Sequence, residues 1–151
     1  MEKQRTFVMI KPDGVQRGFI GDIINRFEKK GLKIIAMKMV SVSKNLAEKH
    51  YIIHKGKPFY EPTVKYIISS PVVAMVLEGF NAIDTVRNMM GKTNPQDAAI
   101  GTIRGDFGQF IGRNIIHGSD SADTAEFEIN LWFKTEEISN YNKIDESWLN
   151  E

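Results

Sequence analysis

The chain has no cysteine among its 151 residues. This absence excludes disulfides, a thiolate nucleophile and any metal site that depends on cysteine ligands. An excess of either charge is also missing, because 20 lysines and arginines are balanced by 19 aspartates and glutamates. A net charge of +1 provides no bulk field that would attract nucleic acid or an anionic membrane. Neither is therefore expected as a partner.

Long hydrophobic runs are absent as well. No apolar stretch approaches the roughly 20 residues that a membrane span needs. The opening segment, MEKQRTFVMIKPDG, has too short an apolar run and too early a break for a signal peptide. What remains is an ordinary globular composition, with 42% hydrophobic and 26% charged residues. We therefore expect one soluble, cytoplasmic domain over residues 1–151, with residues 135–151 as a tail on its surface or on a neighbouring subunit.

Hydrophobic periodicity predicts strands that alternate with helices. The expected strands cover residues 6–10, 32–42, 72–77 and 115–117, and the expected helices cover residues 20–30, 44–54, 63–68, 82–90 and 121–133. Pro12-Asp13-Gly14 is expected to end the first strand in a turn. This order indicates an α+β domain whose sheet is covered by helices on one face.

Residues 92–112 are predicted to form a long, irregular loop. It is rich in glycine and carries Thr93 and Arg104, and Asn114 follows it. Such a loop suits anion binding, because glycine lets backbone N–H groups approach a phosphate closely. A solvated loop with incidental arginines explains the same residues equally well. The MMGKT stretch is not a P-loop, because Val86 stands where the first glycine of that motif is needed.

Two of the three histidines form a pair, His50 and His54, four residues apart. This spacing could bind a metal from one helix face, but no third ligand is evident. A surface position or a ligand contact is the favoured interpretation. Tyr51 and His54 could both face a cleft.

The third histidine, His117, ends an apolar strand and is followed by Gly118, which leaves space around the ring. Ser119 then leads toward a helix start, where free N–H groups favour anions. Glu128 lies eleven residues after His117. A carboxylate on one ring nitrogen would fix the tautomer and leave the other nitrogen as a nucleophile. On these residues alone, a structural histidine remains the favoured interpretation.

Five segments taken together change that balance: IKPDGVQRGFIGDIINRFEKKG, HYIIHKGKPFY, SSPVVAMVLEG, NPQDAAIGTIRGDFG and RNIIHGSDS. They closely resemble the nucleoside diphosphate kinase family, from about Arg5 to Phe133, and NIIHGSDS is highly specific to it. The resemblance implies a ferredoxin-like βαββαβ sandwich, with helices packed on an antiparallel sheet. It also implies ping-pong transfer of the terminal phosphate from a nucleoside triphosphate to a diphosphate through a phosphohistidine, with broad base specificity.

The resemblance also assigns roles to residues. His117 would be phosphorylated, with Glu128 and Ser119 as its supporting partners. Lys11 and Asn114 would contact the sugar hydroxyls, and Lys11 would also lie near the transferred phosphate. The phosphates would be surrounded by Tyr51, His54, Arg87, Thr93 and Arg104, and the base would lie between Phe59 and Ile111.

The implied partners are Mg²⁺, held mainly by the nucleotide phosphates, and nucleotides such as ATP, GTP, UDP, GDP and their deoxy forms. The family forms homo-oligomers, with a hexamer favoured over a tetramer, and the tail and the loop around Pro95 are expected to meet neighbours. The chain departs from the family pattern at Ile100, where proline is common, and at residues 61–63 near the base site. Two alternatives are a binding module without turnover, which His117 argues against, and a nucleic-acid binder, which the near-neutral charge argues against.

Overall fold

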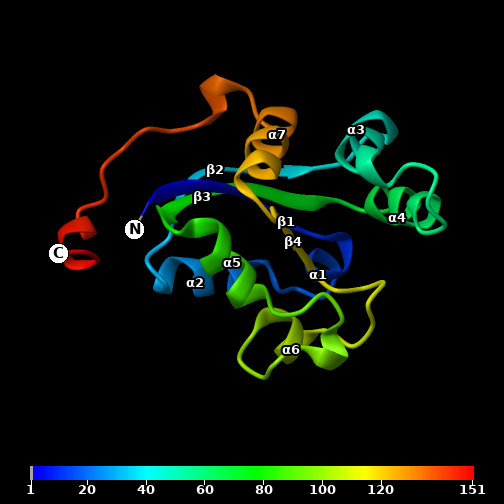
Figure 1. Cartoon of the computed structure of the whole chain (residues 1–151), viewed down its shortest axis with the longest axis horizontal. Helices are drawn as coiled ribbons and strands as arrows, with labels where there is room; N and C mark the ends of the chain where they lie inside the picture. The colour runs from blue at the N-terminus through cyan, green and yellow to red at the C-terminus, as the bar shows by residue number, and fades with distance from the viewer. Residues whose placement is uncertain (1) are drawn as a thin grey trace.

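The computed structural model describes residues 2–151 and contains one four-stranded antiparallel sheet with helices on both faces (Figure 1). The strands are β1 (Lys3–Ile10), β2 (Lys33–Val40), β3 (Val72–Phe80) and β4 (Ile116–Gly118), in the order β2-β3-β1-β4. The expected α+β class with helices packed on an antiparallel sheet is confirmed.

The helices cover the two faces in two groups. They are α1 (Pro12–Gln16), α2 (Ile20–Lys29), α3 (Lys44–His50), α4 (Tyr60–Ile67), α5 (Ala82–Met90), α6 (Ile103–Phe107) and α7 (Ala122–Trp132). Helices α3, α4 and α7 lie on one side of the sheet, and α2, α5 and α6 lie on the other (Figure 1). No helix in residues 2–151 has the length and apolar character needed to cross a membrane.

The expectation that helices cover only one face is wrong, and the central strands show why. Along β1, Phe7 and Met9 join the core beneath α7, whereas Val8 and Ile10 join the core beneath α5. Strand β3 divides its side chains in the same way. A strand that is apolar on both faces needs cover on both sides, which is the pattern of a continuous hydrophobic run rather than of an alternating one.

Several boundaries differ from the predictions because short elements leave little periodic signal. A short helix, α1, replaces the expected turn and begins with Pro12. A second, α6, interrupts the predicted loop, and the Thr102 hydroxyl caps it by accepting from the Gly105 N–H at 3.0 Å. The helix expected over residues 44–54 ends at His50, and a 3-10 turn (Ile52–His54) follows.

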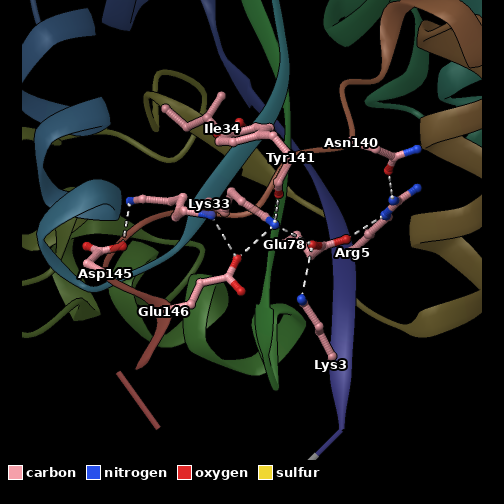
Figure 2. Close-up of polar contacts among 10 residues, drawn as sticks. Lys3, Arg5, Lys33, Ile34, Glu78, Asn140, Tyr141, Asp145 and Glu146 are labelled. Carbon is pink, nitrogen blue, oxygen red and sulfur yellow. Dashed lines mark hydrogen bonds and ion pairs between the residues drawn. The ribbon is translucent and has the colours of Figure 1, made fainter. Parts of the chain in front are cut away.

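After α7 the chain passes through two 3-10 turns (Thr135–Glu137 and Glu146–Trp148) and runs back along β2. The Ser139 N–H donates to the Ile35 carbonyl at 2.8 Å, and Lys33 Nζ donates to the Tyr141 carbonyl at 2.6 Å. Figure 2 shows Lys33 between two carboxylates, with Glu146 at 3.0 Å and Glu78 at 3.3 Å. Hydrogen bonds to Ile35 and from Lys33, together with the ion pairs of Lys33, therefore hold the tail against β2. These ion pairs are called the charge network below.

Candidate active site

A cleft of about 220 Å³ opens beside the end of β4. The predicted site residues that line it are Lys11, Tyr51, His54, Arg87, Thr93, Arg104, Asn114, His117 and Glu128. A larger hollow of about 360 Å³ lies beneath the tail, but the Lys33 and Glu78 charges in its wall are already paired with each other. The smaller cleft is the candidate site, because the predicted nucleophile and the basic groups meet there.

His117 on β4 lines this cleft, and it lies opposite Met9 of β1 in the sheet. Its Nε2 is held by both carboxylate oxygens of Glu128 on α7, at 2.9 and 3.0 Å. The buried Ser119 hydroxyl donates to the same carboxylate at 2.6 Å. A carboxylate that accepts from Nε2 places the ring proton there. Nδ1 is then the nitrogen with a free lone pair.

The chain reaches His117 through a strained turn at Ile115. This buried residue has φ +75°, which is unfavourable for a β-branched side chain. The Ile116 N–H donates to the Asn114 carbonyl at 2.8 Å, which closes a γ-turn of the rare positive-φ kind. Backbone strain of this kind persists only where the surroundings fix it.

Asp13 and the backbone of Lys11 hold this turn in place. The Asp13 carboxylate accepts the Ile115 N–H at 3.0 Å, and the backbone N–H of Lys11 donates to the Ile115 carbonyl at 2.8 Å. The Tyr66 hydroxyl donates to the other carboxylate oxygen of Asp13, and the Arg113 guanidinium lies over the Tyr66 ring. Sequence reasoning treated Asp13 only as a turn residue and missed Tyr66.

Lys11 and Asn114 form a polar pair in the wall of the cleft. Lys11 Nζ donates to Asn114 Oδ1 at 2.8 Å, and Asn114 Nδ2 donates to the Thr93 carbonyl at 3.0 Å. Burial, and then the nearby Arg104 guanidinium, lowers the pKa of Lys11 to about 8. Lys11 is therefore mostly protonated at neutral pH but close to its titration range.

Two arginines bring fixed positive charge. Arg104 is buried and donates to three backbone carbonyls, those of Gly91, Asn114 and Ile116, at 3.1, 3.2 and 2.6 Å. It therefore ties the loop to β4 as well as charging the cleft. Burial and the neighbouring Arg87 lower the pKa of Arg104 to about 10, so it stays charged at neutral pH. Arg87 donates to the Gly118 carbonyl at 3.3 Å.

Three predicted residues do not line the cleft. Ser119 is fully buried behind Glu128. Phe59 is half exposed at the outer side of His54, with ring centroids 5.1 Å apart. Ile111 is exposed on the loop. The two residues assigned to the base thus offer apolar surface outside the enclosed part of the site.

The expected surface position is wrong for His50, which is buried, whereas the alternative of a ligand contact stays a prediction, because His50 lines the cleft. Only 6% of its surface is exposed, and the Trp132 indole donates to its Nδ1 at 3.0 Å. Because α3 ends at His50, His54 does not follow it on one helix face. Sequence reasoning missed Trp132 and its contact with His50, since that contact spans 82 residues.

Both the sequence and the structure of this chain are similar to those of known proteins. The sequence profile of the nucleoside diphosphate kinase family matches residues 4–138. The chain is 58% identical to a nucleoside diphosphate kinase of Archaeoglobus fulgidus and 59% identical to one of Staphylococcus carnosus, over 98% of its length and 98% and 99% of theirs. It superposes with a TM-score of 0.97 on a halophilic nucleoside diphosphate kinase of Halobacterium salinarum in complex with CDP, at 49% identity over 99% of this chain and 100% of that one.

Proposed function

Because this chain belongs to the nucleoside diphosphate kinase family, we propose that it transfers the terminal phosphoryl group of a nucleoside triphosphate to a nucleoside diphosphate through a phosphohistidine at His117. One observation carries the covalent step. Glu128 holds Nε2 of His117 with both oxygens, at 2.9 and 3.0 Å, which leaves Nδ1 free beside a cleft of basic groups.

In the first half-reaction, the lone pair of Nδ1 attacks the terminal phosphorus and forms an N–P bond. The bond from that phosphorus to the bridging oxygen breaks, and its electron pair leaves with the nucleoside diphosphate. The proton on Nε2 stays in place, and the Glu128 carboxylate balances the positive charge that the ring acquires. A second diphosphate then takes the phosphoryl group by the reverse steps. One site that serves both halves gives ping-pong kinetics.

The surrounding groups would stabilise the charge on the phosphates. Phosphoryl transfer depends chiefly on positioning and on electrostatic stabilisation of the equatorial oxygens. Arg87, Arg104 and Lys11 come from three separate segments of the chain, and each brings positive charge to the cleft. Thr93, Tyr51 and His54 are the further phosphate contacts that we propose. Burial, and then the Glu128 charge, raises the pKa of Tyr51, so its hydroxyl remains a neutral donor.

The sugar and the base would lie farther out. We assign the sugar hydroxyls to Asn114 and Lys11, whose polar ends already meet at 2.8 Å. Phe59 offers an exposed ring face for the base, and Ile111 offers apolar surface for its other side. Stacking depends little on the identity of the base, because every base has a π-face. This supports broad base specificity.

The acidic groups in the cleft bear on how Mg²⁺ fits. They are Glu128, which is committed to His117 and Ser119, and the exposed Asp120. Mg²⁺ is usually carried by substrate phosphates with few protein ligands. The cleft therefore suits a nucleotide that brings its own Mg²⁺, which would neutralise part of the phosphate charge when bound.

Homo-oligomer formation is part of the proposal, with a hexamer favoured over a tetramer. Two apolar surfaces support it. Met37 and Met39 are 53% and 60% exposed on β2, and Ile100 and Phe110 on the loop are 94% and 71% exposed. Exposed apolar groups of this kind commonly mark protein contacts.

Initial-rate kinetics would test the exchange. ATP is varied at several fixed concentrations of GDP in the presence of Mg²⁺, and formation of GTP is followed. The proposal predicts parallel double-reciprocal lines and a signal that disappears in H117A. Lines that intersect, or an H117A protein with full activity, would contradict it. Repeating the assay with UDP and CDP tests the breadth of base acceptance.

A further inference from the structure

His50 is a buried histidine beside the proposed nucleophile, and it has no part in the phosphoryl transfer described above. It ends α3, which lies on the same side of the sheet as α7 (Figure 1). Its ring stands nearly perpendicular to that of His117, with centroids 4.7 Å apart. The rings of Phe7 and Trp132 lie 5.9 and 5.6 Å away. These neighbours fix the position of the His50 ring.

The tautomer of His50 follows from its contact with Trp132. An indole N–H is only a donor, so the His50 Nδ1 that it reaches at 3.0 Å is an acceptor without a proton. Burial, and then the charges of His117, Lys11 and His54, keeps the pKa of His50 well below its usual range. The ring is therefore neutral and carries its one proton on Nε2.

That proton faces the carboxylate of Glu128. His50 Nε2 lies 3.7 Å from Glu128 Oε2, and only 5% of the Glu128 side chain is exposed. The oxygen Oε1 receives the Ser119 hydroxyl at 2.6 Å and His117 at 2.9 Å, whereas Oε2 receives His117 at 3.0 Å. His50 thus presents an N–H dipole to the less occupied oxygen, where low solvent exposure strengthens the attraction.

A metal ion is the competing explanation for this cluster. His50, His117 and Glu128 each offer a ligand atom, and these atoms lie within 4.8 Å of one another. A metal would need the lone pair of His50 Nε2, and the ring proton would then have to move to Nδ1. Nδ1 already accepts from Trp132. The indole therefore favours a hydrogen-bonding cluster over a metal site.

Building on the proposed function, we propose that His50 is a positioning residue for this reaction. Its Nε2–H, fixed by Trp132, holds Glu128 in the orientation that keeps the proton of His117 on Nε2 and leaves Nδ1 free to attack. His50 acts through Glu128 and does not touch the transferred phosphoryl group. Its contribution is to the rate of phosphorylation rather than to nucleotide affinity.

Rapid-quench phosphorylation of the full chain tests this link. The rate of phosphohistidine formation is measured with γ-labelled ATP and Mg²⁺ for the wild type, H50F, H50Q and W132F. We expect H50F, which fills the space without a donor, to slow the reaction by about 10- to 100-fold, the range seen when a partner that orients a metal-bound residue is lost. H50Q restores an N–H donor and should recover most of the rate. The ATP concentration at half-maximal rate should change little.

A spectroscopic readout separates positioning from a general loss of packing. Nitrogen-15 NMR of the histidine rings should show His117 as the Nε2–H tautomer in the wild type and as a mixture in H50F. V64A is the matched control, because it removes buried volume from the same hydrophobic core without touching Glu128. It should lower stability and leave the His117 tautomer unchanged.

The outcomes are distinguishable. A wild type that takes up no phosphate overturns the proposed function itself. A wild type that is phosphorylated, together with a folded H50F of equal rate and unchanged His117 tautomer, overturns only the role of His50. If H50F does not fold, W132F decides: a wild-type rate and tautomers in that variant contradict the proposal.

Discussion

The carboxylate of Glu128 holds Nε2 of His117 through both oxygens, at 2.9 and 3.0 Å, across the junction of α7 and β4. This contact decides which ring nitrogen is free. It also makes Glu128 a hydrogen-bond acceptor for Ser119 and His117 at once, which needs a carboxylate oxygen without a proton toward each donor.

The substitution E128Q is expected to slow phosphorylation of His117 by roughly 10²- to 10⁴-fold, the range seen when acid–base or tautomer-fixing groups are lost. A glutamine oxygen in the place of Oε1 can accept from both Ser119 and His117, but its NH₂ group then stands where Oε2 accepts from His117 Nε2–H, so two donors face each other. Single-turnover labelling measures the rate. E126Q, an exposed change on the same helix, is the control and should react like the wild type. Equal rates for E128Q and E126Q would refute the assignment.

Nucleotide affinity should depend on the protonation of Lys11. Its pKa is lowered to about 8 by burial and by Arg104, so the free cleft loses this positive charge as the pH rises above 8. A bound phosphate favours the charged form and raises that pKa again. The dissociation constant for ADP is therefore expected to rise by up to about tenfold per pH unit above pH 8.

Equilibrium titrations with ADP at pH 7, 8 and 9 measure this dependence. K11R keeps its charge throughout the range and should bind with a nearly constant, although weaker, affinity. A wild type whose affinity is flat from pH 7 to 9 would show that Lys11 does not face the phosphates.

Gly105, in α6, should not tolerate a side chain. A Cβ at Gly105 would come within 1.9 Å of the Ala99 carbonyl oxygen, which is backbone and cannot rotate away. We expect G105A to lower the free energy of unfolding by about 2–4 kcal/mol and to loosen Arg104 beside it. G112A is the matched control, because nothing lies within 4 Å of its Cβ position. Urea denaturation of both variants compares them, and equal midpoints would contradict the packing argument.

Part of this architecture could be predicted from local patterns, and the β1, β3 and α5 segments show why. Their apolar spacing is long enough to identify the element, and Gly91, with φ +85°, ends α5 as expected. The resemblance to a known family supplied the roles of His117 and Glu128. The continuous apolar run of β3 indicates cover on both faces of the sheet. Which helices supply that cover could not be predicted, because it depends on how each helix returns to the sheet.

The contacts that escaped prediction join residues far apart in the sequence. Asp13 reaches Ile115 across 102 residues, and Tyr66 reaches Asp13 across 53. His50 and Trp132 are separated by 82 residues. Such pairs have no local periodicity, and each partner also has an ordinary local role as a turn, helix or core residue. Only the folded arrangement shows that they support the site.

The tail is expected to depend on Lys33. K33M removes the hydrogen bonds to Tyr141 and Glu146 and should lower the free energy of unfolding by about 1–3 kcal/mol. Backbone amides in residues 139–149 should exchange faster with solvent, and the phosphotransfer rate should stay unchanged. K30M, at the exposed end of α2, is the control. Hydrogen exchange in the tail that is the same in both variants would argue against a role for the Lys33 contacts in holding the tail.

Acid should release the same contact. The hydrogen bonds with Lys33 and with the Lys143 N–H lower the pKa of Glu146 below its ordinary value of 4.5. The stability that Glu146 contributes is therefore fully present above pH 4.5 and is lost as the pH falls through the lowered value. Tail protection measured between pH 6 and pH 3 should decline in the wild type. Protection that stays constant over this range would contradict the charge network.

The most direct test of the central claim is a pulse–chase with γ-labelled ATP and Mg²⁺. The labelled chain is separated from free nucleotide, the stability of the label to acid and alkali is measured, and unlabelled GDP is then added. We predict label on the wild type that is acid-labile and alkali-stable, absent from H117A, and transferred to GDP. A folded wild type that binds ATP but carries no label would contradict the phosphohistidine mechanism.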